Sequence, residues 1–154
     1  MSDIKNITFK KRPVSLAPDY RPIYKVSQIV LVLGICCRAN KASLLVLHLF
    51  MWAMKSERNA MQLNNWVCND DYNLPVWGME PTLNRGLQYT VAEQLCEKDG
   101  GSYKLTSKGQ DFFQLLLADA ELMQVEKQIL TSIGKKITNK KIDSLTQKWK
   151  YAKD

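Results

Sequence analysis

The sequence predicts a mainly α-helical domain that carries one small β-hairpin. Apolar residues recur at helical spacing along most of residues 22–133. One interruption, Asp99-Gly100-Gly101, has the turn chemistry of a tight hairpin, because glycine accepts the positive φ angles that such turns require. The length of 154 residues fits one such domain with an extension at each end.

Three helices are expected in the first half of this domain. Pro22 suits the first turn of a helix, and helical spacing of apolar residues continues to Cys37. After a short break, a helix over 41–57 is apolar nearly all round, so we expect it at the centre of the core. A third helix is expected over 57–67, and the turn residues of 69–75 predict a loop.

The second half predicts helix, hairpin and helix. Pro81 begins the first of these helices, and strands over 95–98 and 102–105 flank the hairpin turn. Thr106 is placed to cap the next helix. Apolar spacing predicts that this helix runs without a break to Ile133.

Basic charge is concentrated at the two ends of the chain. Residues 1–25 have a net charge of +4 and residues 134–154 a net charge of +5, whereas residues 26–133 have a net charge of −2. We therefore divide the chain into a basic N-terminal arm over 1–21, a helical domain over 22–133 and a basic C-terminal segment.

Two interpretations of the basic ends stay open. Gly134 suits the end of a helix, and a last helix is expected over 139–151. Its lysines and aromatic residues would suit phosphates and bases, but the helical spacing of Ile142, Leu145 and Trp149 favours packing on a neighbouring element. The arm would contact either DNA or an acidic partner. The candidate contacts at the two ends are Lys10, Lys11, Arg12, Lys135, Lys136, Lys140, Lys141 and Trp149.

The chain has no recognisable catalytic motif. Neither a Gly-x-x-x-x-Gly-Lys-Ser/Thr nor a Gly-x-Gly-x-x-Gly phosphate cradle is present. His48, the single histidine, lies in the most apolar segment, so we expect a core residue rather than a general base. The four cysteines have no CxxC spacing, which favours free thiols over a zinc site. We therefore expect no enzyme, no cofactor and no metal.

The longest apolar stretches predict buried helices rather than membrane spans. Residues 29–37 and 42–54 both fall short of the roughly 20 residues that a membrane helix needs. The first twenty-five residues contain no apolar run of the kind that a secretory signal requires. We expect a cytoplasmic protein without membrane contact.

One stretch is similar to the second half of a winged helix-turn-helix domain. It is NRGLQYTVAEQLCEKDGGSYKLTSKGQDFF, residues 84–113, and it contains the element Tyr-x-Leu-Thr-x-x-Gly. The resemblance implies that Tyr103 and Leu105 pack the wing while Thr106 begins the closing helix. It covers about forty residues and says little about activity, because one fold hosts many functions.

A second resemblance covers most of the chain. Residues 21–56, RPIYKVSQIVLVLGICCRANKASLLVLHLFMWAMKS, followed by the YKLTSKG element, resemble the small middle component of bacterial Lamassu-type defence systems. Those systems combine an SMC-like ABC ATPase with a nuclease effector. The resemblance implies a winged helix with extra helices at both ends, acting as a non-enzymatic adaptor between the ATPase and the nuclease in anti-phage or anti-plasmid defence.

The alternative is a stand-alone transcriptional regulator that reads DNA. The helix before the wing would present Asn84, Arg85 and Gln88 to the major groove. Against this, residues 80–119 hold four basic and six acidic residues, and DNA affinity depends heavily on phosphate contacts. Protein contact is therefore favoured for this segment, and Trp77 and Met79 are further candidate contacts.

Overall fold

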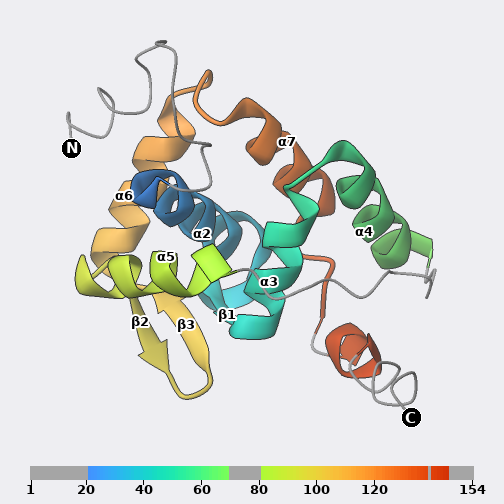
Figure 1. Ribbon diagram of the computed structural model, residues 1–154, viewed down its shortest axis with the longest axis horizontal. Helices are drawn as coiled ribbons and strands as arrows, with labels where there is room; N and C mark the ends of the chain where they lie inside the picture. The colour runs from blue at the N-terminus through green and yellow to red at the C-terminus, as the bar shows by residue number, and fades with distance from the viewer. Residues whose placement is uncertain (1–20, 70–80, 139, 146–154) are drawn as a thin grey trace.

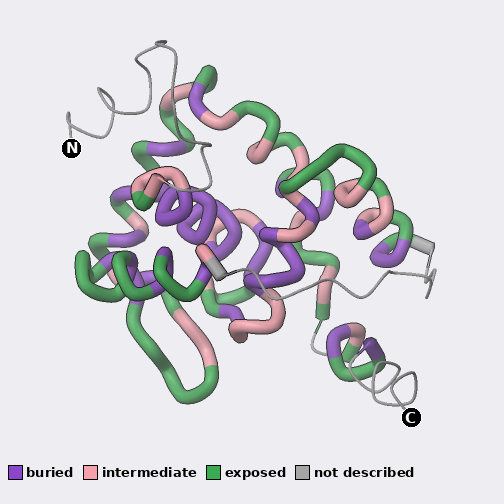
Figure 2. The backbone as a smooth tube through the Cα atoms, in the orientation of Figure 1, coloured by how far each residue is buried: buried purple, intermediate pink, exposed green. Residues whose placement is uncertain are grey.

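A single helix, α2 (Pro22–Cys36), lies at the centre of the fold and is enclosed by the other elements. The computed structural model describes residues 21–69, 81–138 and 140–145. Figure 1 shows α2 lying between α6 and α3, and Figure 2 shows that nearly its whole length is buried. Val30, Leu31, Val32 and Leu33 are all fully buried, so neither side of this helix faces water.

This placement corrects the expectation that the second predicted helix would be central. That helix, α3 (Leu44–Ala53), buries Leu47 and Phe50 but leaves Leu44 and Trp52 only half-buried. Its composition is the more apolar of the two, but composition does not determine how many neighbours a helix has. α2 contacts α5, α6 and α7, whereas α3 packs mainly on α4 (Glu57–Asn69).

Residues 41–43 form a strand, β1, and not the start of a helix as expected. A short 3₁₀ turn, η2 (Arg38–Asn40), leads into it. The helix begins only at Leu44 because the Ser43 hydroxyl accepts the Val46 N–H at 3.3 Å and caps it. β1 pairs with a strand about sixty residues away in the sequence. The spacing of apolar residues within 41–43 cannot predict such a pairing.

The described strands form one antiparallel sheet of three, in the order β1-β3-β2. The predicted hairpin is confirmed as β2 (Cys96–Asp99) and β3 (Ser102–Leu105), with Gly100 at φ +64° in the turn. α5 (Pro81–Ala92) leads into it, and Gln94 adopts a positive φ between them. Gln94 lies beyond the end of α5 at Ala92, and both it and Val91 within the helix are exposed.

The long helix expected after the hairpin is broken into α6 (Ser107–Ala118) and α7 (Gln124–Ile133). Asp119 ends the first helix in an extended conformation, and its carboxylate accepts the Glu121 N–H at 3.0 Å. This local bond competes with the helical pattern, as aspartate side chains commonly do. Met123 then adopts a left-handed φ of 52° before the second helix starts. The expected helix end at Gly134 is confirmed, with φ +59°.

The described part of the C-terminal segment packs on the domain. Residues 140–145 are helical, and Ile142 and Leu145 belong to the hydrophobic core. The Lys141 ammonium lies 5.5 Å from the centre of the Trp66 ring on α4, a cation–π contact. The remainder of the expected last helix, the loop over 69–75 apart from the backbone of its first residue, and the N-terminal arm up to residue 20 lie outside the described residues.

Thr106 and Gly109 lock the hairpin to α5 and α6. The Thr106 hydroxyl accepts the Gly109 N–H at 3.0 Å and donates to the carbonyl of Gln94. The Thr106 N–H donates to the Leu95 carbonyl at 3.0 Å. A Cβ atom at Gly109 would lie 1.9 Å from that same carbonyl oxygen. The Leu-Thr-x-x-Gly element therefore joins the hairpin to the residues after α5 and to the start of α6. Threonine supplies the hydrogen bonds of this junction, and glycine leaves room for the Leu95 carbonyl.

Gly109→Ala is expected to destabilise the fold by about 2 kcal/mol or more, because the added methyl group has to displace backbone atoms. The urea midpoint followed by circular dichroism measures the loss. The matched control is Gly101→Ala, where a Cβ meets nothing within 4 Å and the change should stay within about 0.5 kcal/mol. Equal midpoints for the two variants would contradict the junction described here.

Candidate partner-binding surface

The predicted contact residues of α5 lie on its solvent face. Asn84, Arg85 and Gln88 are exposed, while Leu83 and Leu87 are buried. The helix seats closely on α2 because residue 86 is glycine, where a Cβ would lie 2.4 Å from Lys25 Cγ. Gly86 therefore fixes the distance between α5 and α2, and the three polar side chains project from a rigid support.

Few basic residues lie around the solvent face of α5, where Arg85 lines a small pocket together with Arg21 and the buried Lys25. Arg85 is the basic residue of this helix. At the hairpin, Lys41 Nζ lies 3.6 Å from an Asp99 carboxylate oxygen, and the Lys98 ammonium lies 5.8 Å from the centre of the Tyr103 ring. These two lysines are thus partly engaged within the protein. DNA affinity depends on free cations that contact phosphates. We therefore expect this face to have little affinity for DNA.

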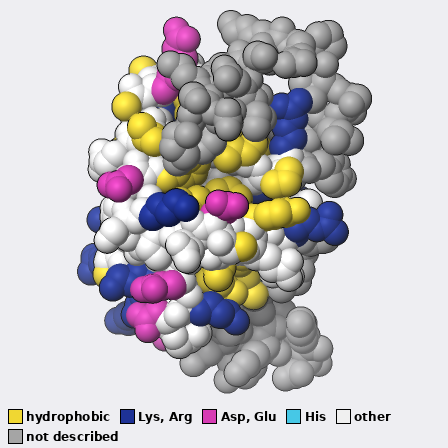
Figure 3. Space-filling model, turned by 90° about the vertical axis from the view of Figure 1, so that its left-hand side faces the viewer, with side chains coloured by type: hydrophobic (Ala, Val, Ile, Leu, Met, Phe, Trp, Pro, Cys, Tyr) yellow, Lys and Arg dark blue, Asp and Glu magenta, His cyan; other side chains and the backbone are white. Residues whose placement is uncertain are grey.

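Exposed apolar side chains are a clearer feature of the surface. Figure 3, which looks onto the side that carries α6, shows hydrophobic side chains gathered across its middle between scattered charges. Leu115 is 51% exposed on α6, and Val125 is 59% exposed on α7. The other large apolar side chains that are exposed are Met61, Tyr89, Val91 and Leu117. Single exposed apolar residues are ordinary, whereas contiguous groups of them are typical of contact surfaces.

Some of these exposed residues share a helix with core residues. Leu115 and Leu117 lie on α6 and Val125 lies on α7, and all three are exposed. The side chains that α6 does bury are Phe112, Phe113 and Leu116.

The described basic residues near the C-terminus have different surroundings. Lys136 Nζ lies 3.8 Å from the exposed Cys68 Sγ and donates to the Ser132 carbonyl at 3.4 Å. Lys135 and Lys140 are exposed, and Lys141 lies over Trp66. In Figure 1 this segment lies apart from the hairpin and α6. The remaining predicted contacts lie outside the described residues: Lys10, Lys11, Arg12, Trp77, Met79 and Trp149.

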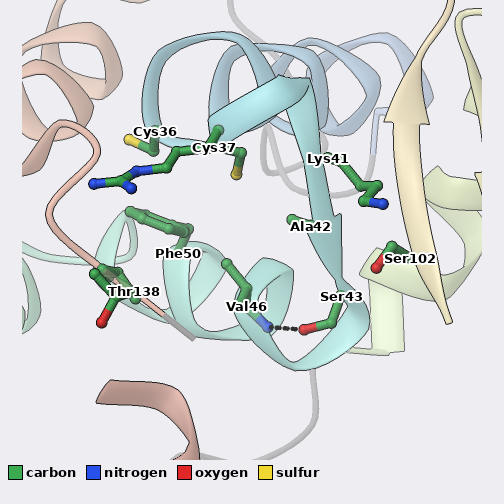
Figure 4. A pocket seen from close by; sticks show the side chains of 11 residues that line it. Cys36, Cys37, Lys41, Ala42, Ser43, Val46, Phe50, Ser102 and Thr138 are labelled. Carbon is green, nitrogen blue, oxygen red and sulfur yellow. Dashed lines mark hydrogen bonds between the residues drawn. The ribbon is translucent and has the colours of Figure 1, made fainter. Parts of the chain in front are cut away.

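The sequence analysis missed two cations at the C-terminal end of α2. Arg38 and Lys41 flank Ala39 and Asn40, which both have left-handed φ values, 58° and 55°. Non-glycine residues in this region cost about 1–3 kcal/mol each and often mark functional sites. An alanine in this conformation has no sequence signature. Arg38, Lys41 and residues of α3 and β3 line a pocket at this end of α2 (Figure 4).

The cysteines and the histidine are mostly interior residues. His48 is 1% exposed, in agreement with its predicted place in the core. Burial raises the pKa of Cys37 to about 12 and that of Cys96 to about 11, and it raises the pKa of Cys36 still further. Cys68 alone among the four free thiols is exposed. Within the described ranges, no three side chains of His, Cys, Asp or Glu converge as metal ligands would.

Comparisons of the chain with protein-family models, with curated proteins and with solved structures give no match. Across the described residues, no helix combines the length and the apolar character needed to cross a membrane. The function is therefore inferred from the chemistry of the exposed side chains.

In the native protein at pH 8, we expect Cys68 alone to react rapidly with Ellman's reagent. A thiolate is the reacting species, and the buried thiols stay protonated because burial raises their pKa values. Cys68→Ser should abolish the rapid phase, while full unfolding of the wild type should release all four thiols.

The same thiols predict a loss of stability in alkali. Their unfolded pKa is near 9.0, and the folded values for Cys96 and Cys37 are about 11 and about 12. The folded state therefore retains protons that the unfolded chain has lost. This contribution to stability is complete below pH 9 and declines as the pH rises toward the folded values. Rapid native modification of Cys37 at pH 8 would contradict both expectations.

Proposed function

We propose that the chain is a winged-helix adaptor subunit that binds other proteins and performs no chemistry itself. The observation that carries this proposal is the combination of exposed apolar side chains on α5, α6 and α7 with a net negative charge over residues 80–119. A surface of this kind suits a protein partner better than DNA, because it offers apolar contact area and few free cations.

The order of the elements supports the winged-helix part of the proposal. α5 leads directly into the β2–β3 hairpin, and β1, from before the intervening helices, joins the hairpin as a third strand. Leu105 is buried and Thr106 caps α6, the roles that the resemblance implied for these positions. α4 is then an addition between the first strand and α5, and α7 with the C-terminal segment extends the domain.

We further propose that the assembly is a Lamassu-type defence complex, in which the adaptor joins an SMC-like ATPase to a nuclease effector. This step rests on the resemblance of residues 21–56 and of the YKLTSKG element. The adaptor would act in the cytoplasm, where free thiols such as those of this chain persist. It would hold the effector until the ATPase detects foreign DNA.

A transcriptional regulator is the second candidate, and one observation favours it. Asn84, Arg85 and Gln88 share the solvent face of the helix that precedes the hairpin. Arginine pairs with guanine and asparagine or glutamine with adenine in the major groove, so these three side chains could read bases. The scarcity of free cations around them is the reason to place this candidate second.

Affinity purification of the tagged chain from its native host tests the adaptor proposal. We expect a coiled-coil ATPase and a nuclease to be recovered with it in fixed ratio, as mass spectrometry would show. Leu115→Lys should lower this recovery about tenfold, because a buried lysine replaces an apolar contact. The control is Gln114→Lys, which adds the same charge at the neighbouring exposed position. Recovery of the chain alone would refute the proposal.

Arg85→Ala separates the two candidates. As an adaptor, the variant should assemble nearly as the wild type does, because the exposed apolar side chains of α6 and α7 are unchanged. As a regulator, it should lose specific DNA binding by about tenfold or more, measured by fluorescence anisotropy at fixed salt. Saturable, sequence-specific binding by the wild-type chain alone would make the regulator the leading account.

A further inference from the structure

Cys68, the exposed thiol of the chain, lies beside an amine. Its Sγ atom is 3.8 Å from Nζ of Lys136, although the two residues are 68 positions apart in the sequence. Cys68 belongs to the last turn of α4, and Lys136 follows the end of α7. These two helices pack side by side (Figure 1), which brings the pair together. The pairing of this thiol with an amine has no part in the adaptor proposal or in the DNA alternative.

Each of the two side chains is also held from a second side. The Cys68 thiol donates to Asn64 Oδ1 at 3.5 Å, one turn back on α4. Lys136 Nζ donates to the Ser132 carbonyl at 3.4 Å, one turn back in the chain. Sulfur and nitrogen are therefore positioned by their own backbone segments as well as by each other.

The segment after α7 is anchored to α4 and the core at further points. The Lys141 ammonium lies 5.5 Å from the centre of the Trp66 ring on α4. Ile142 and Leu145 belong to the hydrophobic core. These contacts keep the segment against α4, so the meeting of Cys68 and Lys136 does not depend on two side chains alone.

An oxidised Cys68 would meet this amine and not a second thiol of the same molecule. Peroxide converts an exposed thiol, in its thiolate form, into a sulfenic acid, whose sulfur is open to attack by a nucleophile. A second thiol often takes that role, but the other three cysteines of the chain are buried. Among the described side chains, the amine in contact with Cys68 is that of Lys136.

We propose that Cys68 and Lys136 form a sulfenamide cross-link when the protein meets hydrogen peroxide. In the first step the thiol and one peroxide give a sulfenic acid and one water; sulfur loses two electrons and the O–O bond breaks. In the second step the unprotonated Lys136 amine forms an N–S bond, and the S–O bond breaks. The hydroxyl group leaves as water with a proton from the amine. The link ties the segment after α7 covalently to α4, and a reducing thiol reverses it.

Oxidation of the native full-length chain with a small excess of hydrogen peroxide at pH 8 tests the proposal by intact mass. We expect a monomer about 2 Da lighter than the starting chain, because the link removes two hydrogen atoms. Dithiothreitol should restore the original mass, and a tryptic digest should contain residues 68 and 136 in one linked pair of peptides. Products that gain only about 16 or 32 Da, the masses of added oxygen atoms, would overturn the proposal. A linked product about 14 Da heavier would place an oxygen between nitrogen and sulfur and would overturn the direct N–S bond.

Three variants assign the link to this pair. Lys136→Arg keeps the positive charge but removes the nucleophilic amine, so the lighter product should disappear and Cys68 should gain oxygen instead. Lys135→Arg is the matched control: this neighbouring lysine is also exposed, and its replacement should leave the yield of the link within twofold. Cys68→Ser should give no lighter product. A loss of about 2 Da that persists in Lys136→Arg or in Cys68→Ser would indicate another link, such as a disulfide between Cys36 and Cys37, and would overturn the proposal.

Discussion

The burial of nearly all of α2 is the constraint on which the rest of this structure depends. A helix that is apolar on every side requires a neighbour on every side, and α3, α5, α6, α7 and β3 supply them. Close approach is needed at two points. A Cβ at Gly34 would lie 2.4 Å from the Phe113 ring of α6, and one at Gly86 would strike the Lys25 side chain. Glycine on one side of each contact allows a bulky side chain on the other.

Two of the polar groups that this burial traps are satisfied locally or by a soft acceptor, whereas the buried Gln28 side-chain oxygen has no hydrogen-bond partner. The Ser27 hydroxyl donates to the Ile23 carbonyl at 2.8 Å, one turn back. Lys25 Nζ lies 3.8 Å from Met51 Sδ, so its long aliphatic stem is buried with it. Such arrangements keep α2 in one register against α3. α5 packs directly on α2, so its orientation depends on the position of α2.

Two surfaces of different chemistry result from this enclosure. The side that carries α6 has apolar side chains and few free cations, which suits a protein partner. The end of α2, where the chain turns into β1, has cations and hydroxyls around a pocket.

The sequence by itself determined the helical class, the hairpin, the cap at Thr106 and the interior place of His48, because these depend on spacing and turn chemistry within a few residues. It also identified the solvent face of α5 with Arg85. Only the tertiary structure decided that α2 is central, that residues 41–43 are a strand and that Leu115 and Val125 are exposed. Each of these depends on contacts between segments remote in sequence. A pattern that reports local periodicity carries no information about which partner a segment will meet.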